Sequence, residues 1–142
     1  IFAGKLRPLG TEVVIRDNLG NIVHRGAPSN QVTSLLKELV KWYEQHKNKY
    51  HPLLLAAVMH NQFENIHPFQ DGNGRVGRLL LNNILLKHKY PPVNISLVNR
   101  REYYLALQEY QTKGNIRPTL DLMLKEYKKM NKELGDYKKK KM

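Results

Sequence analysis

Apolar residues recur at helical spacing along most of the sequence, and this periodicity constrains the fold more than any other feature. Between residues 29 and 127 they return every three or four positions, in stretches separated by prolines, glycines or polar residues. Such a pattern is typical of amphipathic helices that bury one face in a shared core. The sequence therefore predicts an all-α fold of four or five helices.

Residues at the borders of these stretches indicate where the helices begin. Ser29 is a plausible N-cap for the first helix, and Pro52 suits the first position of the second. Asn99 and Glu102 have the spacing of a capping box. Pro118 is placed to open a last helix.

A β-hairpin is predicted ahead of the helices. Two runs rich in β-branched residues, Thr11–Arg16 and Asn21–Arg25, flank the turn-forming segment Asp17–Gly20. A lone two-stranded hairpin is marginally stable in water, so we expect it to lean on the helical core. The fold prediction is thus a compact helical core with an appended hairpin over about residues 11–25.

Composition limits the class of protein. At 142 residues the chain suits one domain, and it has no cysteine, which excludes disulfides and cysteine metal sites. No apolar run approaches the ~20 residues that cross a bilayer, so no membrane partner is expected. With no cysteine and no visible signal peptide, we predict a cytoplasmic protein. Because the chain begins at Ile1 rather than methionine, we expect it to be a fragment.

The net charge of +12 is concentrated toward the C-terminus. Eight lysines and three acidic residues lie between Lys125 and Met142, and Lys138–Lys141 form an unbroken run. We expect residues 131–142 to be a solvated, frayed basic tail. A basic surface attracts nucleic acids and also anionic ligands such as ATP, so charge alone leaves a nucleic-acid-binding module open as an alternative.

A phosphate-binding loop is predicted between two helical stretches. Gly72, Asn73 and Gly74 form a sharp turn that leads directly into a helix. Glycines there allow an anion to approach the free backbone amides at the positive end of the helix. Arg75 and Arg78 are three residues apart, so both guanidinium groups lie on the same helical face.

Two further side chains in this loop suit phosphate chemistry. Asp71 is a hard oxygen ligand for a Mg²⁺ ion that bridges phosphates, and His67 can take a proton near neutral pH. Taken singly, each feature has an ordinary structural interpretation: a core histidine, a turn, a helix cap or a solvated arginine face. Their coincidence between residues 66 and 78 favours a catalytic phosphate site.

The segment His67–Arg78 resembles the signature of Fic-domain proteins, which reads HxFx[DE]GNGRxxR. Every specified position is filled. The similarity extends over roughly residues 3–130, including Ala3–Arg7, Tyr90–Pro92 and Ile116–Pro118. The resemblance implies the Fic fold, a helical core with a β-hairpin flap. It also implies a protein adenylyltransferase, which transfers AMP from ATP to a Ser, Thr or Tyr hydroxyl of a target protein or of itself.

The resemblance also implies roles for the loop residues. His67 would deprotonate the incoming hydroxyl, and Asp71 would hold Mg²⁺ or Mn²⁺. The backbone of Gly72–Gly74, with the Asn73 side chain, would bind the α- and β-phosphates. Arg75 would neutralise the β-phosphate and Arg78 the γ-phosphate.

Two regions outside the loop also receive roles by resemblance. Tyr104 and Gln111 fall near the position where the family encloses adenine. The hairpin flap would pair with an extended segment of the target protein, as an added β-strand. Its residues for this docking would be Val13, Val14, Ile15, Ile22, Val23 and His24.

Many Fic proteins are inhibited by a helix with the pattern Ser/Thr, three residues, Glu, then Gly or Asn. Only Ser34 and Glu38 have this spacing, and Leu39 follows them. We therefore expect the inhibitory helix to lie upstream of Ile1 or to come from a partner, which leaves this chain constitutively active. The alternatives within the family are AMP removal and transfer of phosphate, UMP or phosphocholine. A catalytically inactive scaffold is a further alternative.

Overall fold

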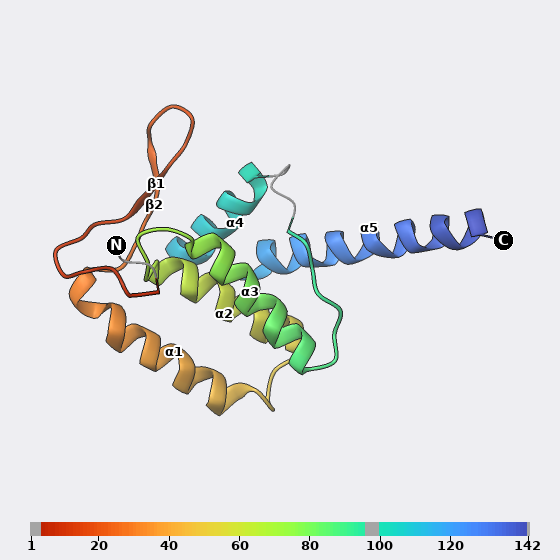
Figure 1. The fold of residues 1–142 in the computed structure, drawn as a ribbon, viewed down its shortest axis with the longest axis horizontal. Helices are drawn as coiled ribbons and strands as arrows, with labels where there is room; N and C mark the ends of the chain where they lie inside the picture. Colours follow the sequence, from red (N-terminus) through yellow and green to blue (C-terminus); the bar gives the residue numbers. More distant parts are fainter. Residues whose placement is uncertain (1–3, 96–99, 142) are drawn as a thin grey trace.

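The computed structural model describes residues 4–95 and 100–141. In this part of the chain a short hairpin precedes five α-helices (Figure 1). The hairpin strands are β1 (Val14–Arg16) and β2 (Ile22–Arg25), and a single 3-10 turn, η1 (Ser29–Gln31), follows them. The helices are α1 (Val32–His46), α2 (Pro52–Ile66), α3 (Asn73–Lys87), α4 (Arg100–Lys113) and α5 (Arg117–Lys141). The predicted helical fold with one hairpin is confirmed.

Helix α2 is the centre of the core, because α1, α3, α4 and α5 all pack against it. Its residues are buried on several sides, and two of the most enclosed side chains in the protein, Leu55 and His60, belong to it. Pro52 occupies its first turn, and the His51 side chain caps it by accepting a hydrogen bond from the Leu53 amide over 3.1 Å. Leu81 of α3 and Met123 of α5 are fully buried against this centre.

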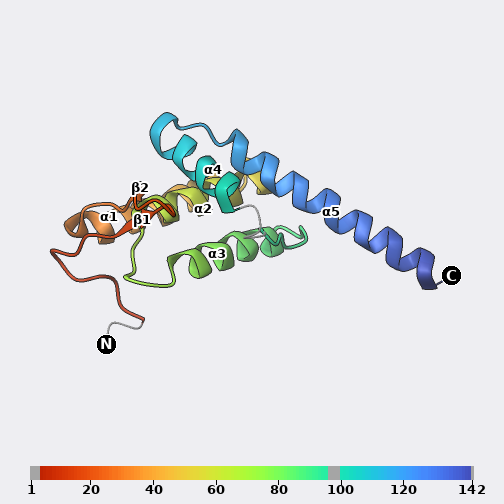
Figure 2. The same ribbon diagram turned by 90° about the horizontal axis from the view of Figure 1, so that it is seen from above.

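The hairpin is shorter than the sequence predicts. Ile15 pairs with His24 and Arg16 with Ile22, with an irregularity between Ile15 and Arg16. The Asp17 carboxylate organises the turn, since its Oδ1 accepts hydrogen bonds from the Leu19 and Asn21 amides, each over 2.9 Å. The hairpin rests on α4 through β2, which gives it the support that an isolated hairpin lacks. It lies at the opposite end of the molecule from the C-terminus (Figure 2).

Two expectations at helix ends are wrong, and a third, the capping box at Asn99, concerns a residue that the structure does not describe. Ser29 does not cap α1, because it lies in η1 and its hydroxyl accepts a hydrogen bond from the Gly10 amide over 2.8 Å. The lysine-rich residues up to Lys141 are not frayed, because they continue α5 as an exposed helix that extends away from the core (Figure 1). Among the described residues, no helix is both long and apolar enough to span a bilayer.

Candidate active site

The predicted site residues from His67 to Arg78 lie in the loop between α2 and α3 and in the first turns of α3. At the start of the loop, His67 ends α2 in the left-handed conformation, with φ 52° and its amide bonded to the Phe63 carbonyl over 3.0 Å. At its end, Gly72 precedes α3 with φ 81°, also left-handed. A non-glycine residue rarely adopts such a conformation, so the surroundings must hold His67 in place.

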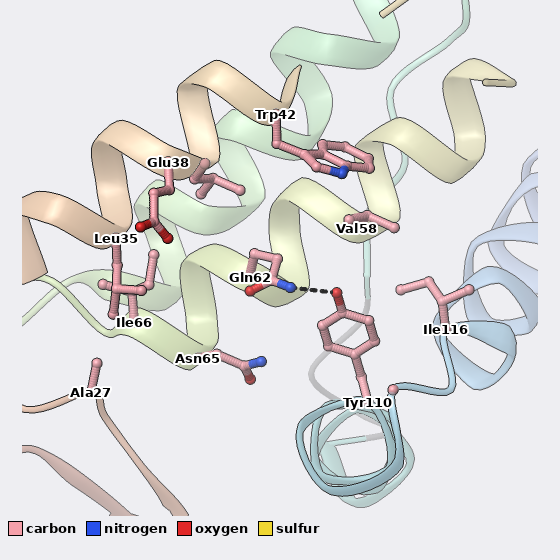
Figure 3. A pocket seen from close by; sticks show the side chains of 12 residues that line it. Ala27, Leu35, Glu38, Trp42, Val58, Gln62, Asn65, Ile66, Tyr110 and Ile116 are labelled. Atoms are coloured by element: carbon pink, nitrogen blue, oxygen red, sulfur yellow. Dashed lines mark hydrogen bonds between the residues drawn. The ribbon is translucent and has the colours of Figure 1, made fainter. Parts of the chain in front are cut away.

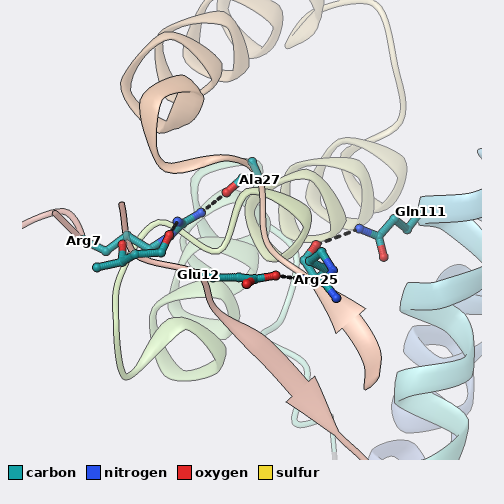
Figure 4. A network of polar contacts seen from close by, with 6 residues as sticks. Arg7, Glu12, Arg25, Ala27 and Gln111 are labelled. Atoms are coloured by element: carbon teal, nitrogen blue, oxygen red, sulfur yellow. Dashed lines mark hydrogen bonds and ion pairs between the residues drawn. The ribbon is translucent and has the colours of Figure 1, made fainter. Parts of the chain in front are cut away.

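Arg7 supplies much of that support. Its guanidinium donates to the backbone carbonyls of His67 (2.7 Å), Ile66 (3.2 Å) and Thr11 (2.9 Å), and also to that of Ala27 (Figure 4). The side chain is buried, with only 4% of its surface exposed. Arg7 therefore ties the end of α2 to the segment before the hairpin and to the segment after it. Sequence reasoning placed Arg7 in the family resemblance and gave it no role.

The His67 imidazole is enclosed, with 8% of the residue exposed, and its Nδ1 has no hydrogen-bond partner among the described residues. Burial lowers its pKa from 6.5 to about 4, and the charges of His24 and Arg7 act in the same direction, whereas the Glu64 backbone opposes them. At neutral pH the ring is therefore uncharged and able to accept a proton.

His24 links the hairpin to the catalytic histidine candidate. Its ring centroid lies 5.7 Å from that of His67. Its Nδ1 donates to the Gln111 Oε1 over 2.9 Å, and the Gln111 amide nitrogen donates to the Arg25 carbonyl over 3.2 Å (Figure 4). Gln111 thus clamps β2 to α4. The adenine contact predicted for Gln111 and Tyr104 stays a prediction, and Tyr104 is half-buried beside Tyr103, with ring centroids 5.7 Å apart.

The N-terminus of α3 has the form of an anion-binding site. Its N-cap is Gly72, so no side chain caps the first amides. Both arginine side chains fold back over this end. A Cβ atom on Gly72 would lie 3.1 Å from Arg75 Nη2, and one on Gly74 would lie 3.1 Å from Arg78 Nη1. Two guanidinium groups and free amides therefore lie at this end of α3, an arrangement that suits a phosphate chain.

Asn73 fixes the shape of the loop. It is 3% exposed, its Oδ1 accepts from the Phe69 amide over 2.8 Å, and its Nδ2 donates to the Phe69 carbonyl over 2.8 Å. The side chain is thus committed to the loop backbone, and direct contact of Asn73 with a phosphate stays a prediction.

Asp71 lies at the open edge of the loop. Its side chain is 95% exposed and pairs with Arg75 Nη2 at 3.4 Å. Among the described residues, no three His, Cys, Asp or Glu side chains gather as a metal cage. Mg²⁺ in nucleotide sites is usually bound by one or two carboxylates together with phosphate oxygens. The single exposed carboxylate of Asp71 suits that mode of binding.

A buried polar layer lies beneath α3. His60 donates from Nδ1 to the Gly77 carbonyl over 2.9 Å, and its Nε2 lies 2.7 Å from the Tyr103 hydroxyl. Burial raises the pKa of the Tyr103 hydroxyl, and the charge of Arg78 acts in the opposite direction. Glu64, 2% exposed, completes the layer. Sequence reasoning missed Glu64, although a single carboxylate in an otherwise buried helical stretch was a visible signal.

The predicted docking residues of the hairpin differ in exposure. Val13, Val14, Ile15 and Val23 are half-buried, Ile22 is exposed and His24 is buried. A separate cleft of about 520 Å³ lies between α1, α2 and α4 (Figure 3). Trp42 and Tyr110 line it, and no residue of His67–Arg78 does. The cleft is therefore distinct from the phosphate site.

The chain is similar to known proteins in sequence and in structure. The sequence profile of the Fic/DOC family matches residues 3–85. Protein adenylyltransferase Fic of Drosophila melanogaster is 41% identical over 85 residues, 59% of this chain and 17% of that protein. The Aedes aegypti protein of the same name is 48% identical over 69 residues, 49% of this chain and 14% of that protein. This chain thus spans about a sixth of the length of these curated relatives.

Solved structures show the same fold. Fic-1 of C. elegans, residues 134–508, superposes with a TM-score of 0.78 at 30% identity, covering 98% of this chain and 39% of that one. A Fic family protein from Desulfovibrio desulfuricans superposes with a TM-score of 0.76 at 30% identity, covering 94% and 41%. BepC from Bartonella tribocorum, solved with bound AMPPNP, has a TM-score of 0.61 at 22% identity, covering 80% and 61%.

Proposed function

The chain belongs to the Fic/DOC family, and on that premise we propose that it is a protein adenylyltransferase, which transfers AMP from ATP to a Ser, Thr or Tyr hydroxyl of a protein target. One observation carries the proposal. The buried, uncharged imidazole of His67 begins the short loop that ends at the uncapped start of α3, over which Arg75 and Arg78 fold. A proton acceptor and an anion site on one loop suit in-line attack on a phosphate.

In the proposed reaction, the target hydroxyl loses its proton to His67 while its oxygen attacks the α-phosphorus of ATP. Because Nδ1 of His67 is enclosed, Nε2 is the nitrogen that meets the hydroxyl. A bond forms between the hydroxyl oxygen and the α-phosphorus, and the bond from that phosphorus to the α–β bridging oxygen breaks. AMP remains on the target and pyrophosphate leaves.

The remaining loop groups stabilise charge. The α3 amides around Gly74 bind the phosphate oxygens, and Arg75 and Arg78 neutralise the leaving pyrophosphate. Mg²⁺ or Mn²⁺, when bound, supplies Lewis-acid stabilisation of the phosphates. Asp71 would hold it, since its carboxylate is exposed at the loop edge.

The hairpin is proposed to dock the target. Strands β1 and β2 form a two-stranded sheet, so each strand has an edge that the other does not cover. An extended target segment can pair with such an edge through backbone hydrogen bonds. His24 connects this edge to His67, which would place the target hydroxyl beside the base. An inhibitory helix from upstream of Ile1 or from a partner remains part of the proposal.

The test is transfer of label from nucleotides that carry ³²P at different positions. With Mg²⁺ or Mn²⁺ and no activator, we expect α-labelled ATP to label the protein itself or proteins of an added cell extract. We expect γ-labelled ATP to leave the protein unlabelled and to add no label to the extract beyond that of the extract alone. The variant His67→Ala should lose the labelling. His46→Ala is the matched control, because its ring stacks on Trp42, away from the loop.

Three results would contradict the proposal. Transfer from γ-labelled ATP would indicate a phosphotransferase. Transfer from UTP or CDP-choline in place of ATP would indicate UMP or phosphocholine transfer. Labelling that persists in His67→Ala would remove that residue from the chemistry.

A further inference from the structure

The cleft between α1, α2 and α4 has the size and the lining of a ligand site, and the proposed reaction does not use it (Figure 3). Its volume of about 520 Å³ lies within the ordinary range of ligand pockets. Much of its wall is apolar, formed by Leu35, Trp42, Val58 and Ile116 among other side chains. Such walls release water when an apolar group packs on them, so they favour a ligand with apolar parts.

The charge of the cleft is opposite to that of the chain. The chain carries a net charge of +12, whereas Glu38 is the one charged side chain among the described residues that line the cleft. Glu38 projects from α1 and is exposed (Figure 3). Its carboxylate forms no ion pair with any described residue. A cationic group that enters the cleft therefore meets an unpaired carboxylate and no competing base.

The cleft also holds a hydrogen-bond acceptor without a donor. Asn65 Oδ1 is shielded from solvent and has no hydrogen-bond partner among the described residues. The polar groups beside it are satisfied, because Gln62 Nε2 donates to the Tyr110 hydroxyl over 2.6 Å (Figure 3). A buried acceptor that lacks a donor costs free energy, which a ligand with an N–H group can recover.

The walls of the cleft are continuous with the residues that surround His67. Ile66, which precedes His67, lines the cleft together with Ala27. Gly26 packs against His67 so closely that an added Cβ would lie 2.9 Å from the His67 Cβ. Strand β2 ends two residues before Ala27. The cleft is therefore close to the hairpin on which the target protein is proposed to dock.

We propose that this cleft is a second docking point for the protein target and that it binds a lysine flanked by apolar residues. The lysine ammonium pairs with Glu38, and a backbone amide of the bound segment donates to Asn65 Oδ1. The apolar neighbours of the lysine pack against Trp42 and the aliphatic walls. A peptide segment supplies the charge, the amide donor and the apolar groups in one molecule. The inference rests on the proposed function, because it takes the protein target as the occupant.

The test is a fluorescence titration of Trp42, which is the single tryptophan of the chain and lines the cleft. The probes are two capped peptides, acetyl-Leu-Lys-Leu-amide and acetyl-Leu-norleucine-Leu-amide, which differ only in the ammonium group. At low salt, the lysine peptide should change the emission saturably. It should bind about fivefold more tightly than the norleucine peptide, as one partly exposed ion pair allows.

Three variants separate the contacts. Glu38→Gln should weaken the lysine peptide about fivefold and leave the norleucine peptide unchanged. Glu44→Gln should behave like wild type, because Glu44 is an exposed acid of the same helix that pairs with Lys47 and lies outside the cleft lining. Asn65→Leu should weaken both peptides without lowering the free energy of unfolding, because the acceptor that it removes has no partner in the chain.

Equal affinity for the two peptides would overturn the inference, and so would the lack of a saturable change up to about 10 mM peptide. An equal loss in Glu44→Gln and Glu38→Gln would overturn it as well. At saturation the lysine peptide should lower the labelling of extract proteins by α-labelled ATP, and unchanged labelling would refute the role in target docking.

The titration contains no nucleotide, so its outcome is independent of AMP transfer. Selective binding of the lysine peptide by a chain that transfers no label would overturn the proposed function and leave the peptide site standing. Transfer of label by a chain that does not bind the lysine peptide would overturn the inference about the cleft alone.

Discussion

Replacing Arg7 by methionine should destabilise the loop that carries His67. Methionine keeps most of the apolar volume of the arginine stem but provides no donor. The carbonyls of His67, Thr11 and Ala27 would lose their guanidinium hydrogen bonds. The Ile66 carbonyl would keep one partner, because it also accepts from the Ala27 amide over 3.2 Å.

The expected loss follows from these three acceptors. A hydrogen bond to a charged group contributes about 1.5–3 kcal/mol, and the contributions within one network are not additive. Relief from burying the guanidinium charge offsets part of the loss. We expect the free energy of unfolding to fall by about 3–5 kcal/mol, near the upper end of single-substitution effects. For a domain of this size that corresponds to a melting temperature roughly 10–17 °C lower.

Urea unfolding followed by circular dichroism measures this difference. The matched control is Arg16→Met. Arg16 is exposed, and among the described residues its one hydrogen bond goes to the Gly20 carbonyl over 2.9 Å, so the loss should be below about 0.5 kcal/mol. Arg7→Lys should fall between the two, because an ammonium group lacks the planar fork. A loss of less than about 1 kcal/mol in Arg7→Met would refute the role assigned to Arg7.

Three further predictions concern the site. Gln111→Ala should raise the KM for a protein target and leave affinity for the α,β-methylene analogue of ATP unchanged, because Gln111 clamps His24 of the hairpin; weakened analogue binding would instead favour the adenine role. The kcat/KM for AMP transfer should rise with pH through about 4 and show no further limb from His67 above pH 6, since its neutral form is the base and its pKa is about 4. Glu64 keeps a proton in the folded chain up to about pH 7 but loses it above 4.5 when unfolded, so its contribution to stability is present at low pH and lost as pH rises. At pH 5.5 wild type releases about one proton from Glu64 on unfolding, and Glu64→Gln does not. The slope of the free energy of unfolding against pH should therefore be more positive in Glu64→Gln by about 1 kcal/mol per pH unit.

Local sequence patterns predicted the helices and the loop well, because these features depend on residues close in sequence. Apolar periodicity located the helical stretches, and Pro52 marked the first residue of α2. Gly72 adopts the positive φ that the turn into α3 requires. The spacing of Arg75 and Arg78 placed both guanidinium groups at the start of α3.

Contacts between distant residues could not be predicted in this way. Arg7 and His67 are 60 positions apart, and His24 and Gln111 are 87 apart, so no spacing rule connects them. The predicted helix cap at Ser29 is wrong for the same reason. The Ser29 hydroxyl accepts a hydrogen bond from the amide of Gly10, 19 positions away. In each case the partner is distant in sequence, so only the three-dimensional fold reveals the contact.

The distribution of these contacts explains how the loop is rigid and still open to a ligand. Arg7 donates to the backbone carbonyls of His67 and Ile66, where the loop begins. Asn73 bonds to the backbone of Phe69 and leaves the amides that follow it uncapped. The bonds of Arg7 and Asn73 thus hold the first half of the loop. The free amides at the positive end of α3 therefore stay available to a ligand. A capping side chain in place of Gly72 would occupy the amides on which phosphate binding depends, and it would be strained at φ 81°.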